Sequence, residues 1–355
     1  MPERVLVTGA GGFIGGRIAE VLHCSGRFTV RAGIRRWSTA ARIARFPMDI
    51  VVADVMDPKS IREAMRGVDL VVNCTKGAGN VIRESIHNVL KAAQDEGVKR
   101  VVHMSTIAVY GDQAGVIDES TPFTRSGNDY GDSKIETEQV CWQFVRDGLP
   151  IVVLRPTIVY GPFSDLWTVE FAERMVTGRW LLPREYCEGT CNLVYVDDVV
   201  LAVIRGLVSP TGLNEAYNIN GPQLDITWNR YFDALNGALG LPPLKAQDRT
   251  TARVMTAVMQ PVRTVAKAAL KRFQEPILDL YKRSAVAKVV MKKAESMIRS
   301  TPTTGEYDMY SRRVSIPSTK AERLLGYRPV FSMAEGVELS AGWLRHHRFV
   351  PQPEA

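Results

Sequence analysis

Tyr130 and Lys134 lie four residues apart, a spacing that places both side chains on one face of a helix. A tyrosine phenol has a pKa of about 10 and is a poor base at neutral pH. A neighbouring ammonium group stabilises the phenolate, and the tyrosine then serves as an acid or a base. Upstream, Ser105 and Thr106 offer hydroxyl groups that can polarise a carbonyl or alcohol oxygen. These residues predict proton transfer at a carbon–oxygen bond, although a Tyr–Lys pair at this spacing is also common on ordinary surface helices.

A glycine-rich segment near the N-terminus separates a strand-like run from a helix-like run. Gly9, Gly12 and Gly15 follow one another at intervals of three, whereas the G-x-G-x-x-G spacing fails because residue 14 is isoleucine. Glycines allow a tight turn and a close backbone approach, and the following helix offers its N-terminal N–H groups to a pyrophosphate. We therefore expect Gly9, Gly12 and Gly15, with Phe13 and Ile14, to bind a dinucleotide.

The second strand-like run lacks the acidic residue that would bind the ribose 2′-hydroxyl of NAD. No Asp or Glu occurs between residues 20 and 49. Instead Arg31, Arg35 and Arg36 lie in and just after this run. A planar, always charged guanidinium favours the 2′-phosphate of NADP. The sequence predicts NADP rather than NAD, with Arg35 and Arg36 as its contacts, and the alternative is an ordinary solvated basic loop.

Asp54 and Val55 come at the end of the third strand-like run. At this place in a dinucleotide-binding sheet we expect them to lie beside the adenine. The alternative is that they cap the helix that begins near Pro58.

The elements that must position these residues are short apolar runs alternating with amphipathic stretches. The runs are rich in Val and Ile and bounded by Gly, Asp or Pro, as in strands buried on both faces. Regular alternation indicates βαβ units, and the expected fold class is α/β, a Rossmann-type doubly wound parallel sheet. The predicted strands are 5–7, 28–32, 50–52, 70–72, 101–104 and 151–154, and the predicted helices are 14–24, 59–65, 80–94 and 130–145.

After residue 155 the pattern becomes irregular, which indicates a second, smaller mixed α/β lobe. We expect residues 1–165 to form the cofactor-binding domain, with part of 190–225 returning to it, and 166–355 to bind the substrate. Within that lobe, 245–300 reads as a two-helix insertion. Its first apolar stripe contains Val254, Val258, Val262, Val265 and Ala269, and its second begins at Leu280.

Composition and charge exclude several classes of protein. Of the 355 residues 45% are hydrophobic and 23% charged, as in an average globular protein. The five cysteines are scattered and odd in number, so neither a disulfide scaffold nor a metal site is expected. The net charge is +7, but residues 245–299 hold thirteen Lys/Arg and four Asp/Glu, a local +9 that leaves −2 elsewhere. Basicity confined to one segment, with no interleaved aromatics, argues against nucleic acid and leaves weak contact with anionic membranes open.

At this point the chain resembles the extended short-chain dehydrogenase/reductases, the epimerase/dehydratase superfamily. The resemblance runs along nearly the whole chain and is specific for the family but weak on the substrate. It depends on the motifs at 8–15, 105–111, 130–134, 154–162, 194–199 and 320–329.

The resemblance implies roles for individual residues. Tyr130 matches the catalytic acid/base, Lys134 the residue that lowers its pKa and binds the nicotinamide ribose, and Thr106 the catalytic Ser/Thr. Ser105 is expected to support the cofactor site. The expected cofactor contacts further along the chain are Cys74, Thr75, Pro156 and Thr157.

Departures from the family narrow the chemistry. Sugar dehydratases carry an Asp-Glu pair after the catalytic Thr, and here those positions are Ile107 and Ala108, so dehydration is not expected. Nucleotide-sugar members often have Asn where this chain has Ile82 and Ile158. Lys76 is an unusual charge near the expected pocket, which either meets an anionic substrate or is a solvated loop lysine.

The sequence therefore predicts an NADP(H)-dependent oxidoreductase that acts on a secondary alcohol or ketone. A nucleotide-linked sugar is the favoured substrate, for a keto-sugar reductase or an epimerase. The alternative substrate is a lipid-like or cyclic ketone, and a second alternative is a non-catalytic cofactor-binding scaffold. We further expect a cytoplasmic homodimer without a signal peptide.

Overall fold

The computed structural model describes residues 2–272 and 302–350. The chain divides into two compact units. Unit 1 comprises Met1–Tyr160, Asn192–Leu224 and Val314–Met333, and unit 2 comprises Gly161–Cys191, Asp225–Arg313 and Ala334–Ala355. Every residue predicted to bind the cofactor or to catalyse belongs to unit 1.

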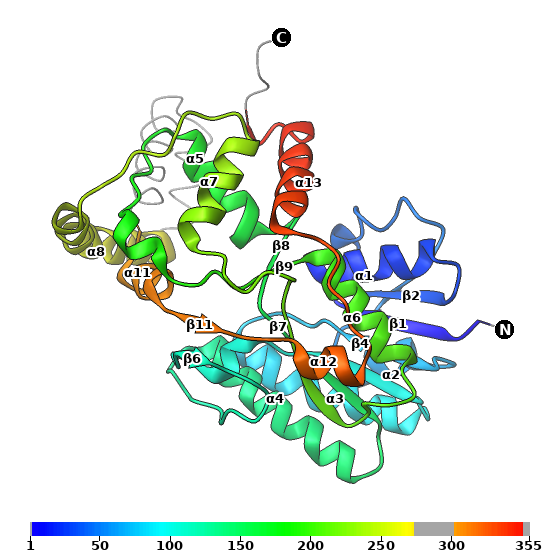
Figure 1. Ribbon diagram of the computed structural model, residues 1–355. Helices are drawn as coiled ribbons and strands as arrows, with labels where there is room; N and C mark the ends of the chain where they lie inside the picture. Colours follow the sequence, from blue (N-terminus) through cyan, green and yellow to red (C-terminus); the bar gives the residue numbers. More distant parts are fainter. Residues whose placement is uncertain (1, 273–301, 351–355) are drawn as a thin grey trace. The chain divides into compact units, whose positions relative to one another are not determined.

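A seven-stranded sheet forms the centre of unit 1 (Figure 1). Its order is β10-β7-β5-β4-β1-β2-β3, and all neighbouring strands run parallel. This confirms the predicted Rossmann-type doubly wound sheet. The order reverses at β1, which lies between β2 and β4, and such sheets bind ligands at the carboxyl ends of the strands beside that point. The strands are β1 (Arg4–Thr8), β2 (Thr29–Ile34), β3 (Asp49–Val52), β4 (Leu70–Asn73), β5 (Arg100–Met104), β7 (Ile151–Pro156) and β10 (Glu215–Ile219).

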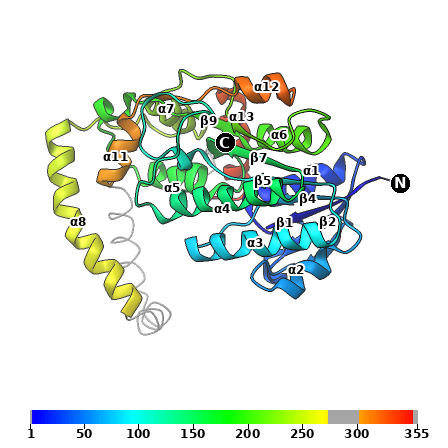
Figure 2. The same ribbon diagram turned by 90° about the horizontal axis from the view of Figure 1, so that it is seen from below.

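Helices cover both faces of the sheet, which is why its strands are apolar on both sides. α1 and α6 pack together on one face, and α2, α3 and α4 lie side by side on the other (Figures 1 and 2). Local sequence fixes where two of them begin, because Asp57 caps α2 and Asn128 caps α4 through their side-chain oxygens. The helices of unit 1 are α1 (Phe13–Cys24), α2 (Pro58–Met65), α3 (Gly79–Asp95), α4 (Asp129–Arg146), α6 (Val196–Val208) and α12 (Thr319–Leu324), with short turns η1 (Trp37–Thr39) and η2 (Ile107–Tyr110).

Two small sheets and a local core support the region after β5. β6 (Gly115–Val116) pairs with β11 (Val314–Ser315), and β8 (Ile158–Tyr160) pairs with β9 (Leu193–Tyr195). A small apolar cluster of unit 1 includes Val109 and Tyr110 from η2 and Ile135 from α4. Because it packs η2 against α4, this cluster holds the two elements that carry Thr106 and Tyr130 in a fixed relation.

Helices and two isolated β-bridges make up the described part of unit 2, and its core is aromatic. The ring of Phe171 stacks on Trp180 at 5.7 Å and meets Phe232 edge-on at 5.0 Å. The Arg174 guanidinium lies over Phe171 and pairs with Glu306 at 2.5 Å. The elements of unit 2 are a π-helical turn (Asp165–Val169), α5 (Glu170–Val176), η4 (Arg184–Glu188), α7 (Trp228–Ala238), α8 (Arg249–Arg272), α11 (Thr304–Ser311) and all but the first residue of α13 (Met333–His346).

The part of the basic segment that the structure describes is α8 with the residues just before it. The predicted apolar stripe is wrong at its first two positions, since Val254 and Val258 are 59% and 62% exposed. Ala252, Thr256 and Met259 are buried instead. Several faces of this helix carry apolar or small residues, so the sequence spacing alone did not identify which face is buried. The later side chains of that stripe, and the second predicted helix, lie outside the described residues.

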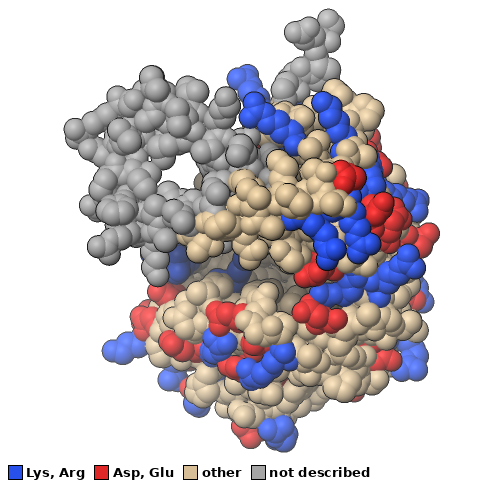
Figure 3. Space-filling view, turned by 90° about the vertical axis from the view of Figure 1, so that its left-hand side faces the viewer, with Lys and Arg blue, Asp and Glu red and all other residues tan. Residues whose placement is uncertain are grey.

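Charges of both signs are interspersed on the face of the molecule shown in Figure 3. Among the described residues, no helix is long and apolar enough to span a membrane. The same residues contain no group of three or more His, Cys, Asp or Glu side chains that could hold a metal ion.

Candidate active site

The glycine loop follows β1 at the point where the strand order reverses. Gly9 has φ +68°, and a Cβ there would lie 2.7 Å from the carbonyl oxygen of Cys74. A Cβ on Gly15 would lie 2.4 Å from the Gly9 carbonyl oxygen, so both positions require glycine. Among the described residues other than its chain neighbours, only the Gly9 carbonyl oxygen lies within 4 Å of a Cβ added to Gly12, at 3.3 Å. The loop is thus tightly packed at Gly9 and Gly15 and leaves space at Gly12.

The N-terminus of α1 is built to receive an anion. Its N-cap is Gly12, and no side chain caps it. The N–H groups of the first turn, from Phe13 to Gly15, therefore have no side-chain acceptor at the N-cap. Unsatisfied N–H groups and the helix dipole together favour a phosphate at such a place. These observations fit the pyrophosphate of a dinucleotide.

A buried polar cluster joins the carboxyl ends of β1, β4 and β5 beneath this loop. The hydroxyls of Thr8 and Thr75 each donate to the Asn73 side-chain oxygen at 2.8 Å. The Asn73 amide nitrogen lies 3.2 Å from Nδ1 of His103. Burial lowers the pKa of His103 well below its ordinary value, so the ring is neutral. The predicted contact residue Thr75 is thus held in place by the strand ends, although its neighbour Lys76 is exposed.

Arg35 and Arg36 follow β2 and are exposed. Their guanidinium groups make no hydrogen bond or ion pair with any residue that the structure describes. Arg31 differs, because its guanidinium donates to Asp49 at 2.7 Å and to the carbonyl of Ala64 at 3.0 Å. Of the three arginines in this stretch, Arg35 and Arg36 therefore present free cations and Arg31 has a structural role.

Other predicted cofactor contacts already have protein partners. Asp54 accepts the N–H of Met56 in its own turn at 3.0 Å, while the cap of α2 is Asp57, so the alternative capping role for Asp54 is wrong. Val55 is 8% exposed and belongs to the main apolar core. Pro156 and Thr157 are buried where β7 ends, and the Thr157 hydroxyl donates to the Asn220 side-chain oxygen at 3.0 Å.

Thr106 and Tyr130 are brought together at the carboxyl end of β5. The Thr106 side chain lies close enough to the Tyr130 phenol to lower the pKa of that phenol. It also caps η2 by accepting the N–H of Ala108 at 3.2 Å. Gly131 makes the approach possible, because a Cβ there would lie 3.0 Å from the Ala108 carbonyl oxygen. The sequence predicted the pair, but Gly131 as the residue that lets α4 approach η2 was missed.

The environment of Tyr130 acts on its pKa in two directions. Burial raises the pKa of Tyr130, and the neighbouring Thr106 side chain lowers it in part. The residue is nevertheless 39% exposed. A tyrosine that is partly desolvated and still accessible is suited to exchange a proton with a bound substrate.

Lys134 lies one helical turn beyond Tyr130 and is 4% exposed. Its ammonium donates to the Met104 carbonyl oxygen at 2.8 Å. Burial lowers the pKa of Lys134 to about 8, and burial raises the pKa of its neighbour Cys74 to about 12. The thiol therefore stays neutral, and the lysine keeps a positive charge that its neighbours leave largely uncompensated.

This burial predicts that Lys134 costs stability in the absence of cofactor. Between its ordinary pKa of 10.5 and the native value of about 8 the folded state binds fewer protons than the unfolded state. The cost of the buried charge, about 3 kcal/mol, is therefore full below pH 8 and disappears as the pH rises toward 10.5. Replacing Lys134 with Met also removes one hydrogen bond worth about 1 kcal/mol. We expect Lys134→Met to stabilise the apoprotein by about 2 kcal/mol at neutral pH while abolishing most activity.

Urea unfolding of the two proteins as a function of pH measures this effect. The advantage of Lys134→Met is expected to shrink between pH 8 and 10.5. The expectation is contradicted if Lys134→Met is less stable than the wild type at neutral pH. It is also contradicted if the difference in the free energy of unfolding between the two proteins does not change with pH.

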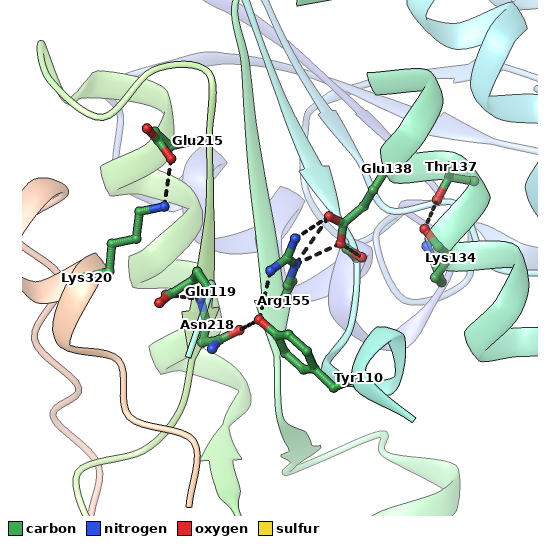
Figure 4. A network of polar contacts seen from close by, with 10 residues as sticks. Tyr110, Glu119, Lys134, Thr137, Glu138, Arg155, Glu215, Asn218 and Lys320 are labelled. Carbon is green, nitrogen blue, oxygen red and sulfur yellow. Dashed lines mark hydrogen bonds and ion pairs between the residues drawn. The ribbon is translucent and has the colours of Figure 1, made fainter. Parts of the chain in front are cut away.

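A buried charge network joins α4 to β7 and η2 (Figure 4). Glu138, on α4 one turn after Lys134, is fully buried and accepts a bidentate pair from Arg155 at 2.6 and 2.9 Å. The Ser105 hydroxyl donates to the same carboxylate at 2.5 Å. Arg155 continues to the hydroxyl of Tyr110 at 2.8 Å. Ser105, predicted to support the cofactor site, thus uses its hydroxyl on Glu138, and the network itself was missed because its members are scattered in sequence.

Asp197 and Asp198, at the start of α6, have structural partners in unit 1. Asp197 accepts Nε and Nη2 of Arg17 at 2.6 and 2.8 Å, which ties α6 to α1. Asp198 accepts the N–H groups of Val330 and Phe331 at 2.7 and 3.2 Å. Neither carboxylate contacts Thr106 or Tyr130.

Comparisons with known proteins agree with this geometry. The family model described as the NAD dependent epimerase/dehydratase family matches residues 5–220. A relative from Stigmatella aurantiaca, the 4-hydroxy-2-methyl-3-oxo-4-farnesyl-3,4-dihydroquinoline-1-oxide ketoreductase, is 27% identical over 220 residues, which are 57% of this chain and 65% of that protein. The chain thus spans slightly less than two thirds of that relative. The UDP-glucose 4-epimerase of Vibrio cholerae is 26% identical over 243 residues, 62% of this chain and 71% of that protein.

Solved structures share the fold. A crystal structure of UDP-glucose 4-epimerase with UDP-glucose from Thermotoga maritima superposes with a TM-score of 0.71 and 22% identity. The similarity covers 97% of this chain and 99% of that one. At this identity the likeness supports the fold of the chain, and the chemistry must be argued from its residues.

Proposed function

The chain belongs to the NAD dependent epimerase/dehydratase family, and we propose that it is an NADP(H)-dependent oxidoreductase that interconverts a ketone and a secondary alcohol. The proposal depends on one observation above all. Thr106 and Tyr130 lie beside each other at the carboxyl end of β5, and the buried cation of Lys134 lies one helical turn away. This is an acid/base pair with a built-in electrostatic bias, placed on a dinucleotide-binding sheet.

In the proposed reaction the bound nicotinamide supplies or accepts the hydride. The Thr106 hydroxyl and the Tyr130 phenol hold the substrate oxygen between them. During reduction the phenol gives its proton to that oxygen as the carbonyl carbon is reduced, and during oxidation the phenolate takes the proton back. The positive charge of Lys134 stabilises the phenolate that forms, which brings the tyrosine into use near neutral pH.

NADP preference is proposed from the free cations that follow β2. Each charge-assisted hydrogen bond to the 2′-phosphate is worth about 1.5–3 kcal/mol, and about 1.4 kcal/mol already gives a tenfold preference. We expect NADP to bind at least about tenfold more tightly than NAD, and Arg36→Ala to lower this ratio about tenfold or more. Arg27→Ala is the matched control, because Arg27 is also exposed but precedes β2 and lies at its other end. Calorimetric titration of the three proteins with both cofactors tests this, and equal affinities in the wild type contradict the assignment.

The substrate is proposed to be a nucleotide-linked sugar, reduced at a keto group or epimerised. The support is the sequence relationship to a UDP-glucose epimerase together with the sugar-type motifs at 192–198 and 320–329. A lipid-like or cyclic ketone is the second candidate. It is favoured by Ile82 and Ile158 at positions where sugar-binding members often have Asn, and by the relationship to a ketoreductase.

One assay separates the two candidates. The protein is incubated with NADPH and either a UDP-linked keto-sugar or an apolar cyclic ketone, and NADPH consumption is followed with NMR of the products. Consumption with only one substrate class selects that class, and conversion of a UDP-sugar without net consumption selects epimerisation. If neither class reacts but NADPH binds, the scaffold alternative replaces the enzyme.

Several finer expectations stay predictions. They are substrate recognition by residues 166–355, a contact of Lys76 with an anionic substrate, a homodimer, a cytoplasmic location and weak, salt-sensitive binding of 245–300 to anionic membranes. Of that last segment the structure describes residues 245–272 only.

A further inference from the structure

An exposed indole follows the two free arginines after β2. Trp37 is 63% exposed. A single exposed apolar side chain is ordinary on a protein surface and by itself indicates nothing. Trp37 is notable for its surroundings, since Arg35 and Arg36 immediately precede it and present guanidinium groups without protein partners in the described part of the chain.

The turn that carries Trp37 has a fixed backbone. The N–H and the hydroxyl of Thr39 both donate to the Arg36 carbonyl oxygen, at 2.9 and 2.7 Å. The N–H of Ala40 donates to the Trp37 carbonyl oxygen at 3.0 Å. Because the turn is closed by hydrogen bonds, its backbone need not reorganise when a ligand stacks on the indole, which lowers the entropy cost of binding.

The same turn lies directly against the glycine loop. A Cβ added to Gly11 would lie 2.6 Å from Oγ1 and 2.8 Å from the carbonyl oxygen of Thr39. The backbone of Ala10 also reaches this strand end, because its N–H donates to the Gly33 carbonyl oxygen at 3.0 Å. The indole is therefore displayed within a few residues of the phosphate-binding loop, at the strand end where the adenosine ribose of a dinucleotide is bound.

We propose that Trp37 stacks on the adenine of the bound dinucleotide, so that Trp37, Arg35 and Arg36 form one site for an adenosine bearing a 2′-phosphate. The indole offers a flat apolar face to the base, and the arginines offer donors to the phosphate. This inference rests on the proposed use of a nicotinamide dinucleotide, and it assigns the base contact to a residue for which the cofactor motifs give no expectation.

Binding of cofactor fragments tests the site without any need for the substrate. Adenosine 2′,5′-bisphosphate, AMP and nicotinamide mononucleotide are titrated by calorimetry into the wild type, Trp37→Ala, Trp37→Phe and Arg36→Ala. We expect Trp37→Ala to weaken both adenosine ligands about tenfold, within the range measured for base–aromatic stacking, and to leave nicotinamide mononucleotide unchanged. Trp37→Phe keeps a ring and should recover most of the affinity, whereas Arg36→Ala should affect only the bisphosphate.

Intrinsic fluorescence gives a second readout. Binding of adenosine 2′,5′-bisphosphate should quench the tryptophan fluorescence of the wild type. It should also quench the fluorescence of Trp142→Phe, in which a half-buried indole of α4 is removed, but not that of Trp37→Phe. If Trp37→Ala binds adenosine 2′,5′-bisphosphate as tightly as the wild type, the inference is wrong even when NADP is preferred. If AMP and the bisphosphate bind equally but both depend on Trp37, the stacking holds and the NADP preference fails. A wild type that binds no adenosine ligand overturns both.

Discussion

Replacing Tyr130 with phenylalanine is expected to lower turnover by about 10²–10⁴-fold, the usual contribution of a positioned proton-transfer group. The substitution removes one oxygen, the atom whose pKa the neighbouring Thr106 side chain lowers. The Tyr130 ring is partly exposed, so the fold and cofactor affinity should change little. Turnover with the true substrate, cofactor affinity by calorimetry and urea unfolding are measured on the same preparation.

Thr106→Val should also lower turnover, since it removes the other group that holds the substrate oxygen.

Tyr110→Phe is the matched control for this experiment, because it makes the same chemical change at a nearby tyrosine. Tyr110 is 1% exposed, and its hydroxyl bridges Arg155 and Asn218 at 2.8 Å each. Removing that oxygen leaves buried polar groups without a partner, at a cost of about 1–3 kcal/mol of stability. Turnover should be retained. If instead Tyr130→Phe keeps most of its turnover, the proton moves through another group and the proposed mechanism is wrong.

The sheet and the cofactor loop were predictable because their signals are local. Short Val/Ile runs bounded by Gly and Asp mark strands buried on both faces, and the six predicted strands all occur, with ends shifted by at most two residues. The seventh strand, β10, joins the same sheet. Gly9 and Gly15 were predictable for the same reason, since their close contacts are made within the motif or to the adjacent strand end.

Contacts between distant segments were not predictable from spacing. Nothing near Gly131 shows that its missing side chain lets α4 approach the carbonyl of Ala108. Ser105 follows the strand that precedes the site, and the sequence does not reveal that its hydroxyl is directed to Glu138, 33 residues later. The same limit applies to α8, where several apolar rows compete and the tertiary partner decides which one is buried.

The Glu138–Arg155 pair yields the second large expected effect. The side chains of Arg155 and Glu138 are 4% and 0% exposed, and their closest atoms are 2.6 Å apart. Removing one member of a buried pair leaves an uncompensated charge in a low-dielectric interior, which costs about 3–5 kcal/mol. We expect Glu138→Ala to lower the free energy of unfolding by about that amount, measured by urea denaturation. Ser105 loses its acceptor in the same variant, which adds to the effect.

Glu136→Ala is the matched control, since Glu136 lies on the same helix and pairs with two arginines where Glu138 pairs with one. Those partners, Arg83 at 2.7 Å and Arg125 at 2.9 Å, are solvent-accessible, so screening limits the expected loss to about 1 kcal/mol or less. The comparison keeps the helix and the residue type and changes the burial of the pair. If Glu136→Ala and Glu138→Ala lower the free energy of unfolding by the same amount, burial does not increase the contribution of the Glu138–Arg155 pair to stability.

A double variant distinguishes the net contribution of the Glu138–Arg155 pair to stability from the cost of leaving one buried charge without its partner. Glu138→Leu combined with Arg155→Met replaces both charges with apolar side chains of similar size, and such exchanges are often neutral or stabilising. The double variant should therefore be more stable than either single variant, although Tyr110 and Ser105 lose partners in it. Ser105 directly precedes Thr106, so the loss of its acceptor should still lower the turnover of the double variant. A double variant with normal turnover would mean that the network contributes to folding alone, and losses that simply add would mean that the two charges do not interact.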